Sequence, residues 1–496
     1  MRDRALATGA SRGYIILFRL NYSPNESMPA IMPSSLGPAF VTDAKPRVPF
    51  SFGGKYFALA VLFSMNLLNY IDRYSFAAVG KLIQTDLHIS NTRYGILYSA
   101  FMVVYTIITP LIGWMGDRYS RRKMLAFGVG LWSLATVGTA FSTGFKDMFF
   151  WRALLGVGEA SYGVIAPTLL ADLFTVKSRG RVMGLYYLAL PLGGAIGYGL
   201  GGWIGQEASW RAAFLVVGVP GLVAAAAGML ILDPGRGASE GHTTTKSERP
   251  KLKDYVEIFQ TPTFVFNTAG MAAVTFLTGA YAAWGSTFFQ TVRGMQPKQA
   301  GVVIGAMTAV AALIGIAIGT WAADLLLKYT RRAYMLLGAA AVFLSIPLGV
   351  AGIMSPDLNI ALPSVFLAML LISMVLGPSN TVTANVVPPN RRAAGFALNV
   401  FLIHLFGDIS SPNVIGLIAD IFGKPAVADS LVGRMFADIG AAPVKGANLT
   451  VGMLTVLPVL ASGVVFFLLG SRYLPRDQDH ALRHDDTATI ATYHHH

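Results

Sequence analysis

The stretch that decides how this chain folds is Gly113-Trp-Met-Gly116-Asp117-Arg118-Tyr-Ser-Arg121-Arg122-Lys123, a dense run of charge between two apolar segments. Residues 94–115 and 124–143 flank it, and each segment has about the 20 residues that a helix needs to cross a bilayer core. Of the 496 residues, 54% are hydrophobic and only 13% are charged, whereas soluble domains carry about 25% charged residues. A soluble enzyme, a fibrous protein and a disordered protein are therefore excluded.

Ten more apolar segments of similar length follow the same pattern along the chain. Uninterrupted apolar runs predict helices, because a lone strand in lipid would leave its backbone polar groups unpaired. The twelve spans are expected at 56–78, 94–115, 124–143, 148–171, 182–205, 211–232, 263–290, 299–324, 333–353, 360–386, 394–418 and 449–471.

The longest polar stretch between spans, residues 233–261, divides them six and six. We predict that it is a flexible linker followed by a short amphipathic helix at 251–259 on the cytoplasmic membrane surface. A short periplasmic helix is expected in the outer loop 419–448. The predicted domains are a disordered cytoplasmic segment (1–50), an N-terminal bundle (51–232), a cytoplasmic linker (233–262), a C-terminal bundle (263–472) and a cytoplasmic tail with a tag remnant (473–496).

Basic residues give the orientation. With both termini in the cytoplasm, about three times as many Lys and Arg residues lie on the cytoplasmic side as on the outer side. The net charge of +13 therefore indicates topology and affinity for anionic lipid, and not nucleic-acid binding. We expect a monomer in a bacterial inner membrane.

Enzyme signatures are missing from the sequence. There is no cysteine, no cluster of histidines with metal-ligand spacing, no Gly-x-Ser-x-Gly elbow and no phosphate-binding loop of the Gly-x-x-x-x-Gly-Lys-Ser/Thr type. We therefore expect no enzymatic activity, no cofactor and no bound metal.

The charged run at 113–123 resembles the cytoplasmic loop signature of the major facilitator superfamily, Gly-x-x-x-Asp-Arg/Lys-x-Gly-Arg/Lys-Arg/Lys, with Ser120 replacing the second glycine. The resemblance implies an all-α membrane protein of twelve transmembrane helices in two six-helix pseudo-repeated bundles. Gly113 and Gly116 would let a helix of the other half approach closely, and Asp117 would hold the cytoplasmic side shut. The alternative is a basic turn that happens to contain an aspartate. The expected cytoplasmic gate comprises Gly113, Asp117, Arg118, Arg121, Arg122 and Asp172.

A degenerate copy of the signature follows the eighth span. It contains Gly319, Asp324 and the basic pair Arg331-Arg332, with a longer spacing. We interpret it as the corresponding loop of the second half.

Four ionisable residues lie inside apolar spans of the first half: Asp72, Arg73, Arg152 and Glu159. Each costs about 2.5–3.5 kcal/mol on insertion scales, so each is a functional candidate. At 1.5 Å per residue, Asp72 lies about 24 Å from the cytoplasmic side and Arg152 about 6 Å from the outer side, so their depths match. Arg152 and Glu159 are two turns apart and share a helix face. Asp72 and Arg73 point about 100° apart and cannot serve the same partner.

These residues predict two roles. Burial favours the neutral form of a carboxyl group and a nearby arginine favours the charged form, so Asp72 and Glu159 are the predicted proton-coupling residues. Arg73 and Arg152 are predicted to hold an anionic headgroup as bidentate donors. The alternative is a structural ion-pair network that locks the helices together.

The second half offers a different set. His404 and Asp408 lie one turn apart on the eleventh span, and Asn380 follows a Gly377-Pro378 pair that is expected to kink the tenth. Substrate contacts are predicted for these three and for the aromatic residues Tyr162, Tyr281 and Trp284. The alternatives are a satisfied core histidine and ordinary aromatic packing.

A closer resemblance is carried by Asn69-Tyr-Ile-Asp72-Arg73-Tyr, by Gly156-Val-Gly-Glu159-Ala-Ser-Tyr162, by Ala171-Asp172-Leu-Phe174 and by His404-Leu-Phe-Gly407-Asp408-x-x-Ser411-Pro412. These runs, between about Asn69 and Asp420, resemble the spinster family. The family implies transport of lysophospholipids or sphingoid phosphates coupled to protons. By position, it also implies a polar and proton site at Asp72, Arg73, Arg152 and Glu159, and a gate at Asp117 and Arg118.

We therefore expect a secondary transporter in which two halves rock around a central cavity. A proton on Glu159 or Asp72 would release an internal arginine–carboxylate pair, and the substrate would compete for the freed arginine. One alternative is a multidrug or small organic anion transporter. An alternative of another class is a membrane receptor or sensor that transports nothing.

Overall fold

The computed structural model describes residues 54–116, 118–235, 252–388, 391–444 and 446–493. The expected disordered segment 1–50, the gate residue Asp117 and most of the polar linker lie outside these residues. Within them, the regular elements are helices, apart from one isolated bridge between Val444 and Ala447.

The first half of the chain forms one bundle, in which α1 packs against α7 and α8 while α4 packs against α5 and α8. Its helices are α1 (Lys55–Ala78), α2 (Gly80–Asp86), α3 (Asn91–Gly116), α4 (Arg121–Thr139), α5 (Phe145–Leu173), α6 (Val176–Tyr187), α7 (Ala189–Glu207) and α8 (Trp210–Gly228).

The second half forms the other bundle, in which α10 and α12 pack against α20, and α12 packs against α13. Its helices are α9 (Leu252–Phe259), α10 (Pro262–Val292), α11 (Pro297–Leu327), α12 (Ala333–Met354), α13 (Leu358–Ser373), α14 (Leu376–Val386), α15 (Arg392–Phe406), α16 (Ser411–Gly423), α17 (Pro425–Ala428), α18 (Leu431–Asp438), α19 (Leu449–Leu454) and α20 (Val456–Tyr493).

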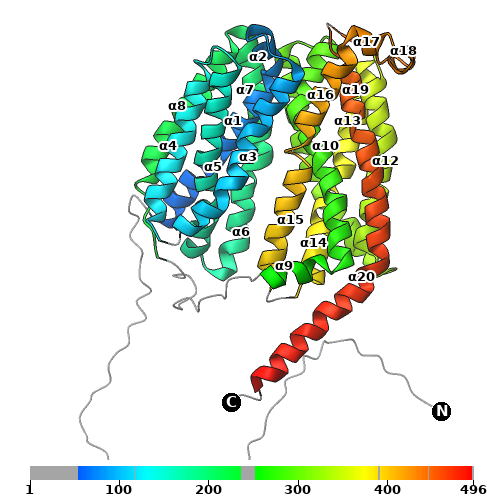
Figure 1. The fold of residues 1–496 in the computed structure, drawn as a ribbon. Helices are drawn as coiled ribbons and strands as arrows, with labels where there is room; N and C mark the ends of the chain where they lie inside the picture. The colour runs from blue at the N-terminus through cyan, green and yellow to red at the C-terminus, as the bar shows by residue number, and fades with distance from the viewer. Residues whose placement is uncertain (1–53, 117, 236–251, 389–390, 445, 494–496) are drawn as a thin grey trace, which may run out of the picture. The chain divides into compact units, whose positions relative to one another are not determined.

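Each of the twelve expected spans coincides with a helix or with a consecutive helix pair. In the part of the chain that the structure describes, ten such segments are long and apolar enough to cross a membrane. The other two positions are occupied by α1 and α4, which carry buried polar side chains such as Asn69 and Thr136. Figure 1 shows the two bundles side by side, with α1–α8 on the left and α10–α16 on the right.

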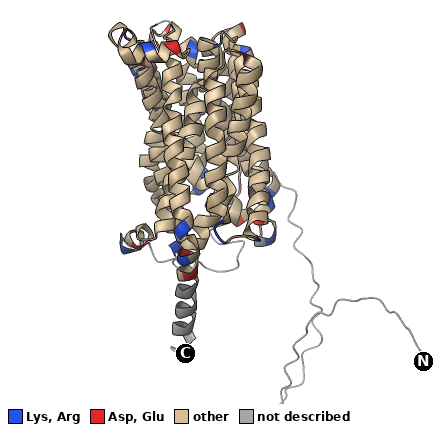
Figure 2. Cartoon of the chain, turned by 90° about the vertical axis from the view of Figure 1, so that its right-hand side faces the viewer, with Lys and Arg blue, Asp and Glu red and all other residues tan. Residues whose placement is uncertain are grey.

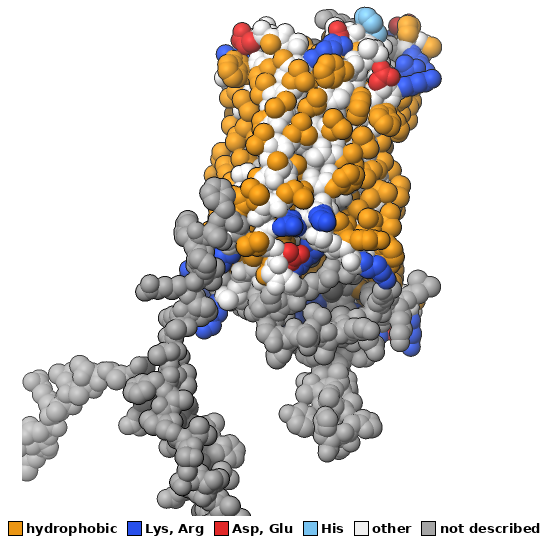
Figure 3. All heavy atoms as spheres, turned by 90° about the vertical axis from the view of Figure 1, so that its left-hand side faces the viewer, with side chains coloured by type: hydrophobic (Ala, Val, Ile, Leu, Met, Phe, Trp, Pro, Cys, Tyr) orange, Lys and Arg blue, Asp and Glu red, His pale blue; other side chains and the backbone are white. Residues whose placement is uncertain are grey.

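The charges mark the two ends of the bundles. Figure 2 shows Lys, Arg, Asp and Glu gathered at the top and bottom of the helices, with few between them. Figure 3 shows the same on the face of the first half, where apolar side chains cover the middle. We call the end that carries α2 and α18 the upper end, and the end that carries α6 and α9 the lower end.

Several spans are broken where the sequence contains proline or glycine. The tenth span is interrupted between Ser373 and Leu376, one turn before Pro378, which has no N–H to donate to the carbonyl of Met374. The eleventh span, expected as one helix over 394–418, is two helices separated at residues 407–410. The last helix, α20, continues to Tyr493, far beyond the expected end of its span at 471.

Candidate functional site

Glycines bring the helix backbones together around the buried charges. A Cβ on Gly156 would lie 2.3 Å from the carbonyl oxygen of Phe101 on α3, and one on Gly197 would lie 2.5 Å from the carbonyl oxygen of Ile71 on α1. Only glycine permits such close approach. The tight contacts of α5 with α3, and of α7 with α1, therefore position Glu159 and the Asp72-Arg73 pair.

An ion pair joins α1 to α5 in the middle of the first bundle. Nη2 of Arg73 donates a hydrogen bond to Oε2 of Glu159 at 2.7 Å. The Glu159 side chain is 2% exposed and that of Arg73 is 19% exposed. The guanidinium of Arg73 also faces the rings of Phe101, at 4.7 Å, and Tyr70, at 5.4 Å. This is an internal arginine–carboxylate pair of the kind that the sequence predicts.

Asp72 points to the other side of α1, as its 100° offset from Arg73 requires. Its Oδ2 accepts a hydrogen bond of 2.5 Å from Oγ1 of Thr136 on α4, while Oδ1 has no hydrogen-bond partner among the described residues. A buried oxygen without a partner is costly unless the group is neutral or meets water. Asp72 is thus a buried carboxyl held by one hydroxyl.

Arg152 does not form the ion pair with Asp72 that their matching depths predict. Its guanidinium lies over the rings of Phe76, at 4.2 Å, and Phe101, at 4.8 Å, and its Nε donates to the carbonyl oxygen of Leu97 at 3.4 Å. In the described part of the chain, its Nη2 has no hydrogen-bond partner. Depth along a helix does not fix the direction of a side chain, and Arg152 is turned toward α3 while Asp72 faces α4.

Arg73 lines two cavities. One, of about 200 Å³, lies within the first half and is bordered by Asn69, Tyr70, Tyr105 and Glu159. The other, of about 100 Å³, lies between the halves. Arg73 is the only charged residue common to both of these cavities.

The cavity between the halves is lined by Tyr98 and Met102 from the first half and by Thr278 and Asp408 from the second. Nδ1 of His404 lies 2.9 Å from both carboxylate oxygens of Asp408, so the pair predicted from their spacing is formed. Asp408 therefore faces the same cavity as Arg73 from the opposite half.

The break between α15 and α16 positions Asp408. A Cβ on Gly407 would lie 1.9 Å from Oγ1 of Thr275, and one on Gly279 would lie 2.5 Å from Cα of Asp408. The broken segment thus lies directly on α10, and the missing helical turn lets Asp408 reach the cavity.

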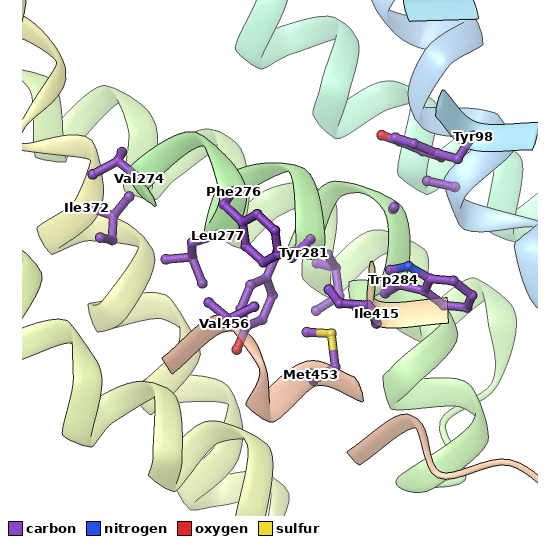
Figure 4. Packing of buried hydrophobic residues seen from close by; sticks show 14 of the residues in the cluster. Tyr98, Val274, Phe276, Leu277, Tyr281, Trp284, Ile372, Ile415, Met453 and Val456 are labelled. Atoms are coloured by element: carbon purple, nitrogen blue, oxygen red, sulfur yellow. The ribbon is translucent and has the colours of Figure 1, made fainter. Parts of the chain in front are cut away.

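Two aromatic residues predicted to contact the substrate, Tyr281 and Trp284, lie outside the two cavities around Arg73. Tyr281 is buried among Leu277, Met453 and Val456, as Figure 4 shows. Trp284 is fully buried, and its indole N–H donates to the carbonyl oxygen of Pro412 at 3.0 Å. Neither lines the two cavities around Arg73. Both pack α10 against its neighbours, which is the alternative that the sequence left open.

Tyr162 and Asn380 are also predicted to contact the substrate, and their surroundings differ from each other. Tyr162 borders the cavity within the first half, but its hydroxyl donates to the carbonyl oxygen of Leu62 at 2.7 Å. Asn380 is exposed on α14 and lines neither cavity around Arg73.

The upper end is closed by contacts between the halves. The α3–α16 and α7–α11 pairs join them, and a Cβ on Gly202 would lie 2.5 Å from the carbonyl oxygen of Pro297. Asp420 on α16 accepts four hydrogen bonds from the start of α3: from N and Nδ2 of Asn91 at 3.2 and 2.8 Å, and from N and Oγ1 of Thr92 at 2.8 and 2.6 Å. We call this arrangement the Asp420 latch.

At the lower end, Arg121 of the loop signature forms ion pairs within its own half. Arg121 forms 2.5 Å ion pairs with Asp172 and with Asp233, which follows α8. Arg118 is exposed and lies over the ring of Trp114 at 4.2 Å. The partly exposed Arg122 follows Arg121 at the start of α4.

Among the residues that the structure describes, the glycines of the signature have no close neighbour from the other half. A Cβ on Gly113 would meet nothing within 4 Å, and one on Gly116 would meet only Ile165 of its own half. The close approach expected at these glycines is therefore absent from this conformation. In the described residues, the Asp420 latch joins the two halves at the upper end.

Comparison with known proteins agrees with this architecture. The sequence profile of the Major Facilitator Superfamily matches residues 62–412. The protein spinster of Drosophila melanogaster is 32% identical over 407 residues, which cover 80% of this chain and 66% of that protein. Spinster homolog 1 of Xenopus tropicalis is 33% identical over 399 residues, which cover 75% of this chain and 74% of that protein.

The chain belongs to the spinster family of the major facilitator superfamily. The resemblance read from the sequence motifs is thereby confirmed, and with it the twelve-helix, all-α fold. The chain is an integral membrane transporter and not an enzyme. It spans about two thirds of the length of the Drosophila protein.

Solved structures share the fold. A bacterial homolog of the human lysosomal transporter Spinster, in an inward-facing and unoccupied conformation, aligns with a TM-score of 0.74 at 24% identity, covering 85% of this chain and 98% of that chain. A D-xylose–proton symporter aligns with a TM-score of 0.66 at 16% identity, covering 84% and 97%.

Three residues, Thr136, Asp233 and Asp420, were not predicted from the sequence. Thr136 and Asp233 are ordinary residues in a helix and at a helix end, and no local pattern marks them as partners of charges. Asp420 comes directly after a span, but its partner Asn91 lies 329 positions earlier in the chain. The contacts of Asp420 depend on how the two halves pack against each other, and neither segment of sequence determines that packing by itself.

Proposed function

We propose that this spinster protein moves an amphiphile with an anionic headgroup, of the lysophospholipid or sphingoid-phosphate class, by alternating access coupled to protons. The observation that carries the proposal is Arg73, which lines both cavities while it is paired with the buried Glu159. A guanidinium can hold a phosphate with two parallel hydrogen bonds. Aromatic and apolar neighbours such as Tyr98 and Met102 suit the adjoining chain of an amphiphile.

The proposed coupling is a competition for Arg73. In the pair, the carboxylate of Glu159 neutralises the guanidinium. When Glu159 takes up a proton, it no longer compensates that charge, and an anionic headgroup becomes the better partner. Substrate binding and proton binding then favour each other, as linkage between two sites requires.

Asp72 is the second proposed proton site. It lines neither cavity around Arg73, and its free oxygen Oδ1 is buried. Its hydrogen bond with Thr136 links α1 to α4 inside the first half. Protonation of Asp72 would therefore act on the packing of the first bundle, whereas protonation of Glu159 acts on the headgroup site directly.

The charge bias supports one orientation of the chain in the membrane. We propose that the lower end, where Arg121 lies and where Arg391 pairs with Glu257 of α9, faces the cytoplasm of a bacterial cell, and that the chain acts as a monomer in the inner membrane. The predominance of Lys and Arg in the lower loops supports this orientation. The predicted cytoplasmic gate at residues 113–122 and Asp172 would then close below when the Asp420 latch opens above.

The experiment is uptake of a labelled lysophospholipid into proteoliposomes with and without an imposed pH gradient. We expect the gradient to stimulate uptake by the unmodified protein, and Glu159→Gln to lose that stimulation because the site no longer titrates. Asp429→Asn, which changes an exposed carboxyl outside the spans, is the control and should keep it. Equal stimulation in Glu159→Gln would remove the proton role, and flux of soluble organic anions without any lysolipid flux would favour the alternative substrate class.

A further inference from the structure

A short helix outside the bundles lies at the upper end, in the loop between α16 and α19. Figure 1 shows α17 and α18 at the top right, beside the upper ends of the second bundle. Gly433 of α18 lies directly on α17, since a Cβ there would be 2.1 Å from the carbonyl oxygen of Val427. The ring of Phe436 meets Phe422 of α16 edge-on, with centroids 5.5 Å apart. These two contacts hold α18 at a defined position on the molecule.

One face of α18 carries exposed aliphatic side chains, which we call the α18 stripe. Its members are Leu431, Val432, Met435 and Ile439, and between 51% and 73% of each is exposed. At 100° per residue they fall within one third of the helix circumference. Arg434 and Asp438 are exposed on the adjoining side. The helix is thus amphipathic, and the part of the chain that the structure describes does not cover its apolar face.

We propose that α18 lies in the membrane–water interface at the upper surface, with the α18 stripe inserted among the lipids and Arg434 at the level of the phosphates. Two observations favour lipid. Figure 1 shows α18 at the upper end of the molecule, and Figure 2 shows charged residues gathered at that end, where a bilayer's headgroups would meet the protein. Its composition, an aliphatic face with a basic residue beside it, is that of an interfacial helix.

The size of the stripe argues against a protein partner. Four aliphatic side chains on two turns cover at most a few hundred Å², roughly half of the area of about 800 Å² that each partner buries in a stable protein interface. A lipid surface sets no such minimum, because the spanning helices already anchor the chain in the membrane. Since α18 is attached to α16 through Phe436 and Phe422, docking in lipid would also fix the height of the α16 segment that carries Asp420.

The absence of cysteine from the sequence makes a direct test simple. Met435→Cys places a single thiol on the stripe and Asp438→Cys places one on the polar side, one turn away. Each variant is labelled with an environment-sensitive nitrobenzoxadiazole dye in nanodiscs of phosphatidylcholine and phosphatidylglycerol. Quenching is then measured with aqueous iodide and, separately, with lipids that carry a nitroxide near the headgroup.

We expect the label at Met435 to be quenched about threefold less by iodide than the label at Asp438, and to be quenched by the nitroxide lipids. Equal iodide quenching at the two sites would overturn the proposal. Protection of the Met435 label from both quenchers would also overturn it, because that result indicates contact with protein, such as a second copy. Ile439→Cys and Arg434→Cys form a second pair on the same two sides and give the same readout if the first pair is poorly folded.

Discussion

Replacing Asp420 by alanine should open the upper end of the transporter. The carboxylate accepts four hydrogen bonds from Asn91 and Thr92 at the start of α3, two of them from backbone N–H groups. Hydrogen bonds to a charged group are each worth about 1.5–3 kcal/mol, but water replaces them when the halves separate and Asp420 is partly exposed. We therefore expect a net loss of about 1–3 kcal/mol from the upward-closed state, which shifts the equilibrium between conformations about 5- to 150-fold.

The assay is a distance measurement between the halves at the upper end. Spin labels on Lys146→Cys and Asn359→Cys, both exposed near upper helix ends, report the separation by pulsed electron resonance in nanodiscs. We expect the unmodified latch to give a short distance and Asp420→Ala to add a longer one. Asp420→Asn keeps one acceptor oxygen and should lie between the two. A distance distribution for Asp420→Ala that matches the unmodified protein would refute the latch.

Three further predictions concern the lower end and the buried charges. Arg73→Lys keeps the charge but loses the planar fork, so we expect the Kd for a lysophospholipid, measured by thermal shift, to rise about tenfold; an unchanged Kd would exclude a bidentate headgroup contact. Gly113→Leu meets open space, so the Tm should stay the same while proteoliposome transport is lost, since closure below needs the glycine; full transport would argue against the gate. Thr136→Val removes the hydroxyl that donates to Asp72, and we expect it to cost about 1–3 kcal/mol of stability in thermal unfolding. The hydroxyl of Thr139 donates only to a carbonyl of its own helix, so the control Thr139→Val should cost less.

The positions of the helices could be predicted from the sequence because the thickness of the bilayer core sets the length of each span. A bilayer core requires about 20 apolar residues, and each expected span corresponds to a helix or helix pair. The breaks within individual spans were harder to predict. The break at residues 407–410 has local signals, Gly407 and Pro412, but a run of apolar residues on both sides conceals it.

The buried charges could be found from the sequence, but their pairing could not. The cost of charge in lipid singles out Asp72, Arg73, Arg152 and Glu159 without any structure. The matching depths of Asp72 and Arg152 predict an ion pair between these two residues, whereas in the structure Arg73 forms an ion pair with Glu159. Depth gives the height of a residue in the membrane, while the direction of its side chain depends on how α1 and α5 are rotated in the bundle.

The proposed competition between the Glu159 carboxylate and an anionic headgroup for Arg73 is tested most directly by counting the protons taken up on binding. Titration calorimetry with a lysophospholipid in two buffers of different ionisation enthalpy gives the number of protons exchanged per molecule bound. We expect uptake of up to about one proton per substrate molecule bound by the unmodified protein, and none for Glu159→Gln. Binding heats that are the same in both buffers for the unmodified protein, or equal proton uptake in the Glu159→Gln variant, would contradict it.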